Sequence, residues 1–249
     1  MIKLYLAIIL VCITCNINSQ SKLSKENSEK WEWNLAPYVW AVGMKGDLTV
    51  KNLEVPLNLK FGDVVENVNI GVMLHAEAKK NRWSIMTDIF YAKINQNEFP
   101  EQVLMDLNTE ITITQKMIEL GGAYTFTELN TFKMDFLLGA RYFSLNTEID
   151  ADNLSAIVIE ENFIDPFVGV RFINHWNKFS LGGRIDVGGF GVGSEVSYKY
   201  NVGAGYQFTE LFKLDIGYQV YNPRYENNNQ DLIYDLASQG FILGGNFRL

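Results

Sequence analysis

Cysteine and histidine are scarce in this chain, and acidic residues outnumber basic ones. The 249 residues include two cysteines, Cys12 and Cys15, and two histidines, His75 and His175. Zinc sites need a cluster of cysteine, histidine or carboxylate ligands at suitable spacing, and no such motif is present, so we expect no metal and no other cofactor. Lysine and arginine total 21 against 29 acidic residues. Nucleic-acid binding depends on a basic surface, so nucleic acid is not an expected partner.

The chain also lacks a long hydrophobic run. Its longest apolar stretch, residues 4–15, is too short for a transmembrane helix, which needs about 20 residues. Preceded by Lys3, it is typical of a secretory signal peptide. We therefore expect cleavage after residues 1–19, followed by a flexible polar lead-in at residues 20–30. The mature chain would contain no disulfide; lipidation at Cys15 is the alternative.

The glycine-rich stretch GGRIDVGGFGVGSEVSY, residues 182–198, could suggest a nucleotide-binding loop. A dinucleotide fingerprint, however, places its third glycine three residues after the second, at the start of a helix. Here Gly193 follows Gly191 by two residues, and the next residues alternate and are rich in valine and tyrosine, which is typical of a strand. The pattern predicts a tight turn between two strands.

Alternation of apolar and polar residues continues from Trp31 to the C-terminus. It predicts ten strands, near residues 31–43, 68–79, 82–95, 109–126, 131–147, 160–173, 178–189, 194–208, 212–222 and 239–249. Strands of soluble proteins usually have about five or six residues, whereas a strand that crosses a bilayer needs about nine to eleven. The strand lengths therefore favour a membrane protein.

The connections between these strands alternate in length. The short ones lie at 79–82, 127–131, 174–178 and 209–212, and those between them are mostly longer: 44–67, 96–108, 148–159 and 223–238, with a shorter turn at 190–193. Outer-membrane barrels have short periplasmic turns and longer external loops. Residues 31–249 are thus predicted to form an all-β, up-and-down antiparallel transmembrane barrel of about ten strands, or twelve if a hairpin within 44–67 joins the wall.

One face of each predicted strand is aliphatic and aromatic, and the other carries charge and glycine. Outer-membrane lipid would contact the apolar face, so the lumen would hold His75, Glu77, Asp88, Glu119, Arg141, Asp165, Arg171, Arg184, Asp186, Lys199, Asp215 and Arg248. Opposite charges can pair and fill a narrow lumen, for example as a ladder across neighbouring strands built from Arg171, Arg184, Asp186 and Lys199. They can also line a conduit for a small polar solute or ion.

Aromatic residues gather at two levels of the predicted strands. Near the short connections lie Trp31, Trp33, Trp83, Tyr124, Phe126, Phe132, Phe172, Trp176, Phe179, Tyr206, Phe208, Phe212 and Phe247, as in an interfacial aromatic girdle. A second, looser ring is expected from Trp40, Tyr91, Tyr142, Tyr198, Tyr218 and Phe241.

The chain resembles bacterial outer-membrane β-barrel proteins of porin-like families, many of which have no assigned activity. The resemblance rests on WNLAPYVWAVGMKGDLTV, DPFVGVRF, DVGGFGVGSEVSYKYNVGAGYQFTELFKLDIGY and GFILGGNFRL. It implies export to the outer membrane of the Gram-negative envelope and recognition by the barrel-assembly machinery. Gly244, Phe247 and Leu249 match the glycine and apolar positions of the assembly signal, although the usual last residue is aromatic.

Candidate catalytic groups are few. His75 could act as a base oriented by Glu77 or Asp88, which would make the protein a barrel hydrolase of lipid or peptide. No nucleophile stands in a matching motif, and no histidine lies in the outer loops, where ten-stranded surface proteases carry their histidine. We therefore expect a non-enzymatic barrel, either a narrow porin-like channel or a surface-loop structural or interaction protein, with the hydrolase as the alternative.

Overall fold

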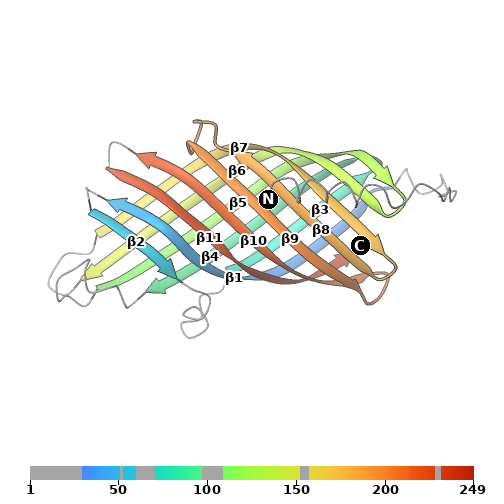
Figure 1. The fold of residues 1–249 in the computed structure, drawn as a ribbon, viewed down its shortest axis with the longest axis horizontal. Helices are drawn as coiled ribbons and strands as arrows, with labels where there is room; N and C mark the ends of the chain where they lie inside the picture. Colours follow the sequence, from blue (N-terminus) through green and yellow to red (C-terminus); the bar gives the residue numbers. More distant parts are fainter. Residues whose placement is uncertain (1–29, 51–52, 60–70, 97–108, 152–156, 228–230) are drawn as a thin grey trace, which may run out of the picture.

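The computed structural model describes residues 30–50, 53–59, 71–96, 109–151, 157–227 and 231–249. In these residues eleven strands form one antiparallel sheet, which closes into a barrel because β11 pairs with β1 as well as with β10 (Figure 1). Among the described residues no helix is long and apolar enough to cross a membrane. The predicted signal peptide and all but the last residue of the predicted lead-in lie outside this part of the chain. The strands are β1 (Glu32–Val50), β2 (Leu53–Leu59), β3 (Gly71–Lys80), β4 (Trp83–Gln96), β5 (Thr109–Leu129), β6 (Phe132–Ala151), β7 (Ile157–Trp176), β8 (Phe179–Gly188), β9 (Val196–Gln207), β10 (Phe212–Asn227) and β11 (Leu232–Arg248).

Two of these strands, β2 and β3, share one position in the barrel wall. One edge of β1 pairs with β11 along almost its whole length. Its other edge pairs with β3 through residues 32–40 and with β2 through residues 44–50. Strand β2 therefore continues the line of β3, and the wall has ten positions. The ten-stranded prediction is confirmed; the hairpin within 44–67 joins the wall without producing the twelve-stranded alternative.

Three of the short connections are tight turns that place asparagine in the left-handed backbone region. Asn81, Asn130 and Asn177 have φ angles of 57°, 41° and 53°, a conformation that asparagine tolerates better than most residues. Strand β1 begins and β11 ends at the same end of the barrel, because Asn34 is the register partner of Arg248. The three turns lie at this end. We call this the short-turn end and the opposite end the loop end.

The turn between β8 and β9 at the loop end is the glycine turn expected from the sequence. Gly189 and Gly191 have φ angles of +86° and +71°. A Cβ atom on Gly189 would clash with the Oγ of Ser194, whereas one on Gly191 would meet nothing within 4 Å. Glycine is thus required for the backbone conformation at both positions, and at Gly189 also for close packing. The residues that follow form strand β9 rather than a helix.

The strands extend further toward the loop end than predicted. Strand β1 continues to Val50, β10 to Asn227, and β11 begins at Leu232, so much of the predicted loops at 44–67 and 223–238 is strand. These extensions arise because the alternation of side chains persists there with the opposite polarity.

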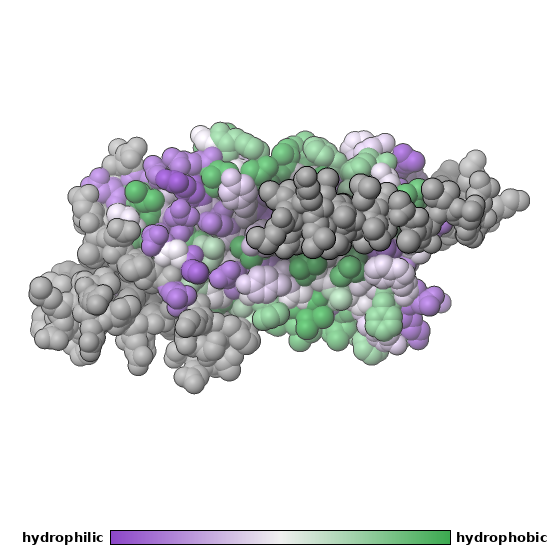
Figure 2. Space-filling model, viewed as in Figure 1, coloured by the Kyte–Doolittle hydropathy of each residue, from purple (hydrophilic) through white to green (hydrophobic). Residues whose placement is uncertain are grey.

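Strand β6 shows this reversal clearly. Toward the short-turn end its outward side chains are apolar and exposed, including Phe136, Leu138 and Tyr142. Toward the loop end its outward side chains are Ser144, Asn146 and Glu148, while inward Phe143 and Leu145 are buried. Among the coloured residues of Figure 2 the same change is visible, with hydrophilic residues gathered over the loop-end half and hydrophobic residues over much of the other half.

The apolar belt fits a bilayer in height and in composition. On β4 it runs from Trp83 to Tyr91, and on β6 from Phe132 to Tyr142, matching the roughly nine to eleven residues of a tilted transmembrane strand. Aromatic rings mark both limits, and most of the predicted girdle residues are exposed on the wall. The short-turn half of the barrel is therefore the membrane-spanning half, and the loop-end half stands in water.

The prediction that Trp40 belongs to the second aromatic ring is wrong. It has no exposed surface and lies inside the barrel, where its ring centroid is 5.1 Å from that of Phe90. The other expected members on β4, β6, β9 and β11, namely Tyr91, Tyr142, Tyr198 and Phe241, are exposed on the wall. Trp40 differs because it lies on the inward face of β1, beyond the level at which the inner face becomes apolar.

The predicted assembly-signal residues occupy distinct places on β11 and beyond it. Gly244 packs closely against Tyr38, and a Cβ atom at this position would clash with that of the tyrosine. Phe247 is on the outer wall with its ring centroid 5.1 Å from that of Phe212, and Leu249 is exposed at the end of the chain. Recognition by the assembly machinery stays a prediction.

The polarity reversal predicts opposite outcomes for one substitution made at two heights on the same face. Leu138→Arg should lower the unfolding free energy by about 2–4 kcal/mol, because it places a charge near the bilayer midplane. Asn146→Arg, outward on β6 above the belt and hydrogen-bonded to Glu160, should have little effect. Urea titrations in lipid vesicles would measure both, and equal costs would contradict the assigned membrane boundary.

Candidate functional site

A layer of buried charge crosses the middle of the lumen. Six side chains from five strands form it: Asp88, Glu119, Arg141, Arg184, Asp186 and Lys199. Arg184 reaches Glu119 at 2.6 Å and Asp186 at 2.7 Å, and Lys199 reaches Glu119 at 3.2 Å. With three carboxylates and three cations the layer is formally neutral. Such neutrality matters because an uncompensated charge in a low-dielectric interior is costly. We call these six residues the charged layer.

Arg141 is the central member of the charged layer. It is fully buried, and its Nη2 lies 2.9 Å from Glu119 and 2.8 Å from Asp186. Its guanidinium also lies 5.0 Å from the ring centroid of Phe167 and 4.9 Å from that of Tyr221, a favourable arrangement for a cation between aromatic faces. The arginine thus joins the charged layer to the aromatic side chains next to it.

A second polar cluster lies on the short-turn side of the charged layer. Arg171 donates two hydrogen bonds to Glu77, of 2.7 and 2.9 Å, in the bidentate geometry typical of strong arginine–carboxylate pairs. It also binds Asp135 at 2.7 Å, and Asp135 accepts a 2.7 Å hydrogen bond from Thr125. Glu77 is on β3 and Arg171 is on β7, with three strands of the wall between them, so this pair connects distant parts of the wall across the lumen.

These pairings differ from the ladder expected from the sequence. Lys199 is the register partner of Asp186 on the neighbouring strand, but its amine contacts Glu119 from β5 instead. Arg171 is the register partner of Arg184, another cation, and turns toward Glu77. The charges therefore pair across the lumen as well as along the wall, because a narrow barrel brings opposite walls within reach of long side chains.

His75 lies between the two polar clusters. Its Nδ1 is 3.0 Å from Asp88 and its Nε2 is 3.6 Å from Glu77. Asp88 in turn accepts a 3.1 Å hydrogen bond from the hydroxyl of Tyr38. The proposed couple of His75 with Asp88 or Glu77 is present in geometry, but both ring nitrogens face carboxylates. Nδ1 is within hydrogen-bond distance of Asp88, whereas the 3.6 Å between Nε2 and Glu77 is too long for a hydrogen bond.

Three of the expected lumen residues belong to neither cluster. Asp165 is buried beside Arg141, its register partner on β6, but it accepts hydrogen bonds of 2.7 Å from the backbone N–H and 2.6 Å from the hydroxyl of Ser194. It anchors the glycine turn to the barrel. Asp215 pairs with Lys213 at 2.8 Å, and Arg248 pairs with Glu32 at 3.2 Å; both pairs stand at the mouth of the short-turn end.

The lumen is hollow toward the short-turn end. A cavity of about 740 Å³ opens there, with Arg171, Arg184, Lys199 and His75 among its lining residues. Asn34, Asn201 and Asn246 contribute amides to its wall. The charged layer closes the cavity on its inner side, so it has the form of a vestibule.

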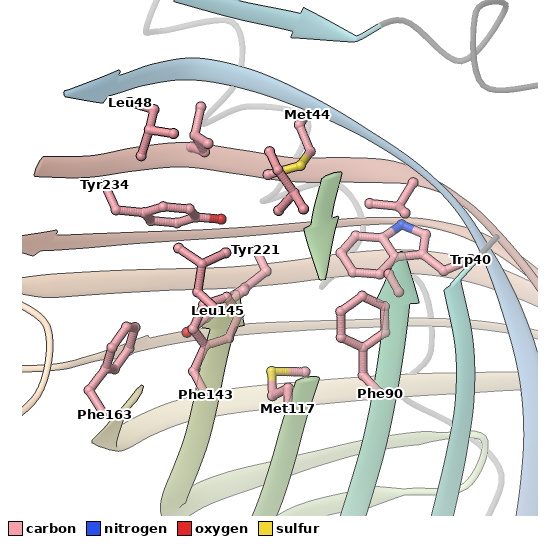
Figure 3. Close-up of a cluster of buried hydrophobic side chains, with 14 of the residues drawn as sticks. Trp40, Met44, Leu48, Phe90, Met117, Phe143, Leu145, Phe163, Tyr221 and Tyr234 are labelled. Carbon is pink, nitrogen blue, oxygen red and sulfur yellow. The ribbon is translucent and has the colours of Figure 1, made fainter. Parts of the chain in front are cut away.

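Beyond the charged layer, toward the loop end, the lumen is filled by an apolar core. Seventeen buried side chains compose it: Trp40, Val42, Met44, Leu48, Met73, Phe90, Ala92, Ile113, Met117, Phe143, Leu145, Ile159, Phe163, Tyr221, Leu232, Tyr234 and Leu236. Their rings and aliphatic groups point inward from opposite walls and meet (Figure 3). The ring centroid of Phe143, for example, lies 5.2 Å from that of Phe163 and 5.6 Å from that of Tyr221.

Polar groups inside the apolar core are few, and several are paired. Gln115 donates a 2.7 Å hydrogen bond to the hydroxyl of Tyr234 and accepts one of 3.1 Å from Ser238. Pairing of this kind offsets the cost of burying an amide. The core therefore resembles the interior of a soluble β-barrel.

Sequence reasoning missed the apolar core and Asp135. The signal for both was present in residues 132–151: Asp135, Arg141, Phe143 and Leu145 share one parity, and the polarity of that face changes after Arg141. The prediction assigned one face of each strand to lipid along its whole length and therefore did not include this change. Among the described residues, no group of three or more His, Cys, Asp or Glu side chains is arranged to hold a metal ion.

Comparison with known proteins identifies the fold. No protein-family model matches the chain, and no curated protein matches it in sequence. The outer membrane protease OmpT from Escherichia coli superposes with a TM-score of 0.58 at 12% identity, covering 93% of this chain and 100% of that chain. This likeness concerns the fold. Together with the closed ten-position wall and its exposed apolar belt, it makes the chain an outer-membrane β-barrel protein in architecture.

Other solved barrels are similar to a lesser degree. The translocator domain of the autotransporter NalP from Neisseria meningitidis gives a TM-score of 0.44 at 12% identity, covering 90% of each chain. A major outer membrane protein from Thermus thermophilus gives 0.42 at 10% identity, covering 88% of this chain and 99% of that chain.

Proposed function

We propose that the protein is a non-enzymatic, non-conducting outer-membrane barrel that holds a rigid platform above the membrane for interactions at the cell surface. The observation that carries this proposal is the apolar core, which fills the lumen of the loop-end half. A polar solute or ion crossing the barrel would have to displace packed aromatic side chains after passing the charged layer. With the short turns in the periplasm, as in other outer-membrane barrels, this core stands outside the cell.

The architecture suits a platform better than a pore. Barrels of about eight strands are filled by their side chains, and wide aqueous channels occur at about sixteen or more. Ten positions in the wall fall near the filled limit. The outward polar residues above the belt, such as Lys93, Lys116 and Glu148, give the projecting half a hydrated surface, so its core stabilises it as in a soluble domain.

A hydrolase is the less supported alternative. Nδ1 of His75 contacts Asp88 at 3.0 Å and Nε2 faces Glu77 at 3.6 Å, and the ring lines the vestibule at the short-turn end rather than the outer surface. His175 is near the end of β7, also at the short-turn end. OmpT is named a protease, but at 12% identity its activity is not transferred to this chain.

Conductance in planar lipid bilayers tests the proposed function. The wild-type protein should show no ohmic steps, and Arg184→Ala should also stay silent because the apolar core remains packed when the charged layer is weakened. A known porin in the same bilayer would show that insertion is detected. Steady conductance of the wild type with an ion selectivity altered by Asp186→Asn would establish a channel instead. Lipid or peptide hydrolysis abolished by His75→Ala would establish an enzyme.

A further inference from the structure

The wall of the projecting half is interrupted between β7 and β10. Strand β8 ends at Gly188, opposite Phe167, and β9 begins at Val196, opposite Arg224. Strand β7, however, continues outward to Ile157, and β10 continues to Asn227; among the described residues these outer parts pair only with β6 and with β11, respectively. Residues 157–163 of β7 therefore form an open strand edge, which we call the β7 edge.

The β7 edge presents backbone groups that have no backbone partner within the described residues. The carbonyl of Pro166 accepts a hydrogen bond from Gly189 on the β8 side. Because alternate residues of a strand direct their N–H and C=O groups to the same side, Val158, Glu160 and Asn162 direct theirs to the same open side. In the part of the chain that the structure describes, no strand pairing or other backbone hydrogen bond engages these groups.

The open edge has only part of the usual protection against added strands. Natural edge strands are commonly blocked by charged side chains, above all lysine, by an inward-pointing charge, by a proline or by a bulge. Residues 157–163 contain neither lysine nor proline, and their charges, exposed Glu160 and buried Glu161, are both acidic. These charges disfavour an acidic strand and favour one that carries positive charge, so the edge can pair with a basic strand.

Side chains, rather than backbone, close the interior behind this edge. The ring centroids of Phe163 and Tyr225 lie 4.7 Å apart and nearly parallel. Buried Glu161 accepts hydrogen bonds of 2.8 Å from both Tyr225 and Asn227. The apolar core is therefore sealed without the missing strands, and a strand could add to the edge without opening the barrel.

The surroundings of the β7 edge are acidic. Glu148, Asp150 and Glu160 are exposed on β6 and β7 and form no ion pair with any described residue, although Glu160 accepts a hydrogen bond from Asn146. Across the gap, Glu195 and Glu226 share Arg224, at 3.2 and 3.4 Å. The excess of negative charge would attract a basic partner and repel an acidic one.

From these observations we propose that the β7 edge binds an extended basic segment of another protein as an added strand. Alternate side chains of such a strand point to opposite faces. Its outward residues would be lysine or arginine beside Glu160, and its inward residues would be apolar, next to Ile159 and Phe163. This inference rests on the proposed function, because it supplies the partner class for the surface platform.

Amide hydrogen exchange of the full chain in lipid nanodiscs, measured by NMR, tests the proposal. The probe is a capped peptide of about six residues that alternates lysine and valine, and the control peptide alternates glutamate and valine. The lysine peptide should slow exchange at Val158, Glu160 and Asn162 by at least about tenfold, equivalent to about 1.4 kcal/mol. The glutamate peptide should leave all three amides unchanged.

Two charge reversals separate the edge from general surface attraction. Glu160→Lys should weaken binding of the lysine peptide by about tenfold, equivalent to about 1.4 kcal/mol. Asp47→Lys should not weaken it, since β1 is paired on both sides at that residue. Equal effects of both peptides, equal effects of both substitutions or unchanged edge amides would each overturn the proposal.

A different occupant would also be detected in the same measurement. Protection of the three amides without peptide, increasing with protein concentration, would identify a second copy of this chain and overturn the proposal. If the lysine peptide does not bind the β7 edge and the wild-type protein shows no conductance, only the edge proposal fails and the proposed platform function is retained. Conductance of the wild-type protein in the bilayer assay would contradict the platform function, independently of the result with the peptides.

Discussion

Arg141→Leu should lower the unfolding free energy by about 3–5 kcal/mol, because removing one member of a buried ion-pair network leaves an uncompensated charge. In this variant Asp186 keeps Arg184 and Glu119 keeps Arg184 and Lys199, but the charged layer has three carboxylates against two cations. The cation between the rings of Phe167 and Tyr221 is lost as well. Denaturant titration followed by tryptophan fluorescence in vesicles would measure the change.

A second substitution separates charge imbalance from lost packing. In Arg141→Leu combined with Asp186→Asn, the charged layer again has equal numbers of carboxylates and cations, and Arg184 and Lys199 both keep Glu119. The double variant should be more stable than Arg141→Leu alone. If the unfolding free energy of the double variant falls by the sum of the losses measured for Arg141→Leu and Asp186→Asn alone, charge balance does not explain the stability of the layer.

Phe143→Ala should cost about 3–5 kcal/mol, the range for removing a packed aromatic side chain and leaving a cavity. Phe143 lies within 5.2–6.2 Å, between ring centroids, of Phe163, Tyr221 and Tyr234. Its loss would remove the contacts that join the β6–β7 wall to β10 and β11 through the apolar core. The same titration would report the cost.

Phe136→Ala is the matched control for Phe143→Ala. Phe136 is on the same strand, but its side chain is exposed on the apolar belt. Its truncation should cost less, since lipid fills the vacated space and no internal cavity remains. Equal costs would mean that the apolar core is not packed as a protein interior.

The architecture was accessible from the sequence because its signals are local. Alternation with a period of two defines the strands, and asparagine at 81, 130 and 177 marks the tight turns. The apolar residues between Trp83 and Tyr91 match a bilayer in length. Each of these signals depends on neighbouring residues along one strand or turn, so no distant contact is needed to interpret it.

The charged residues of the lumen were also recognisable individually, but their partners were not. Parity along a strand places Arg171 and Glu77 on the inner face. Their bidentate contact depends on the curvature that brings β7 opposite β3. Likewise, Lys199 has an acidic residue beside it on β8 and still pairs with Glu119 on β5.

The sequence by itself determined the class of barrel, its strand positions and which face of each membrane-spanning segment meets lipid, because alternation and composition are properties of consecutive residues. Only the tertiary structure decided that the loop-end half is filled. Phe143 and Tyr234 lie on β6 and β11, far apart in the chain, yet their rings lie 6.2 Å apart inside the barrel. Their burial follows from closure of the sheet between β1 and β11, which converts one face of ten separate strand positions into a single interior.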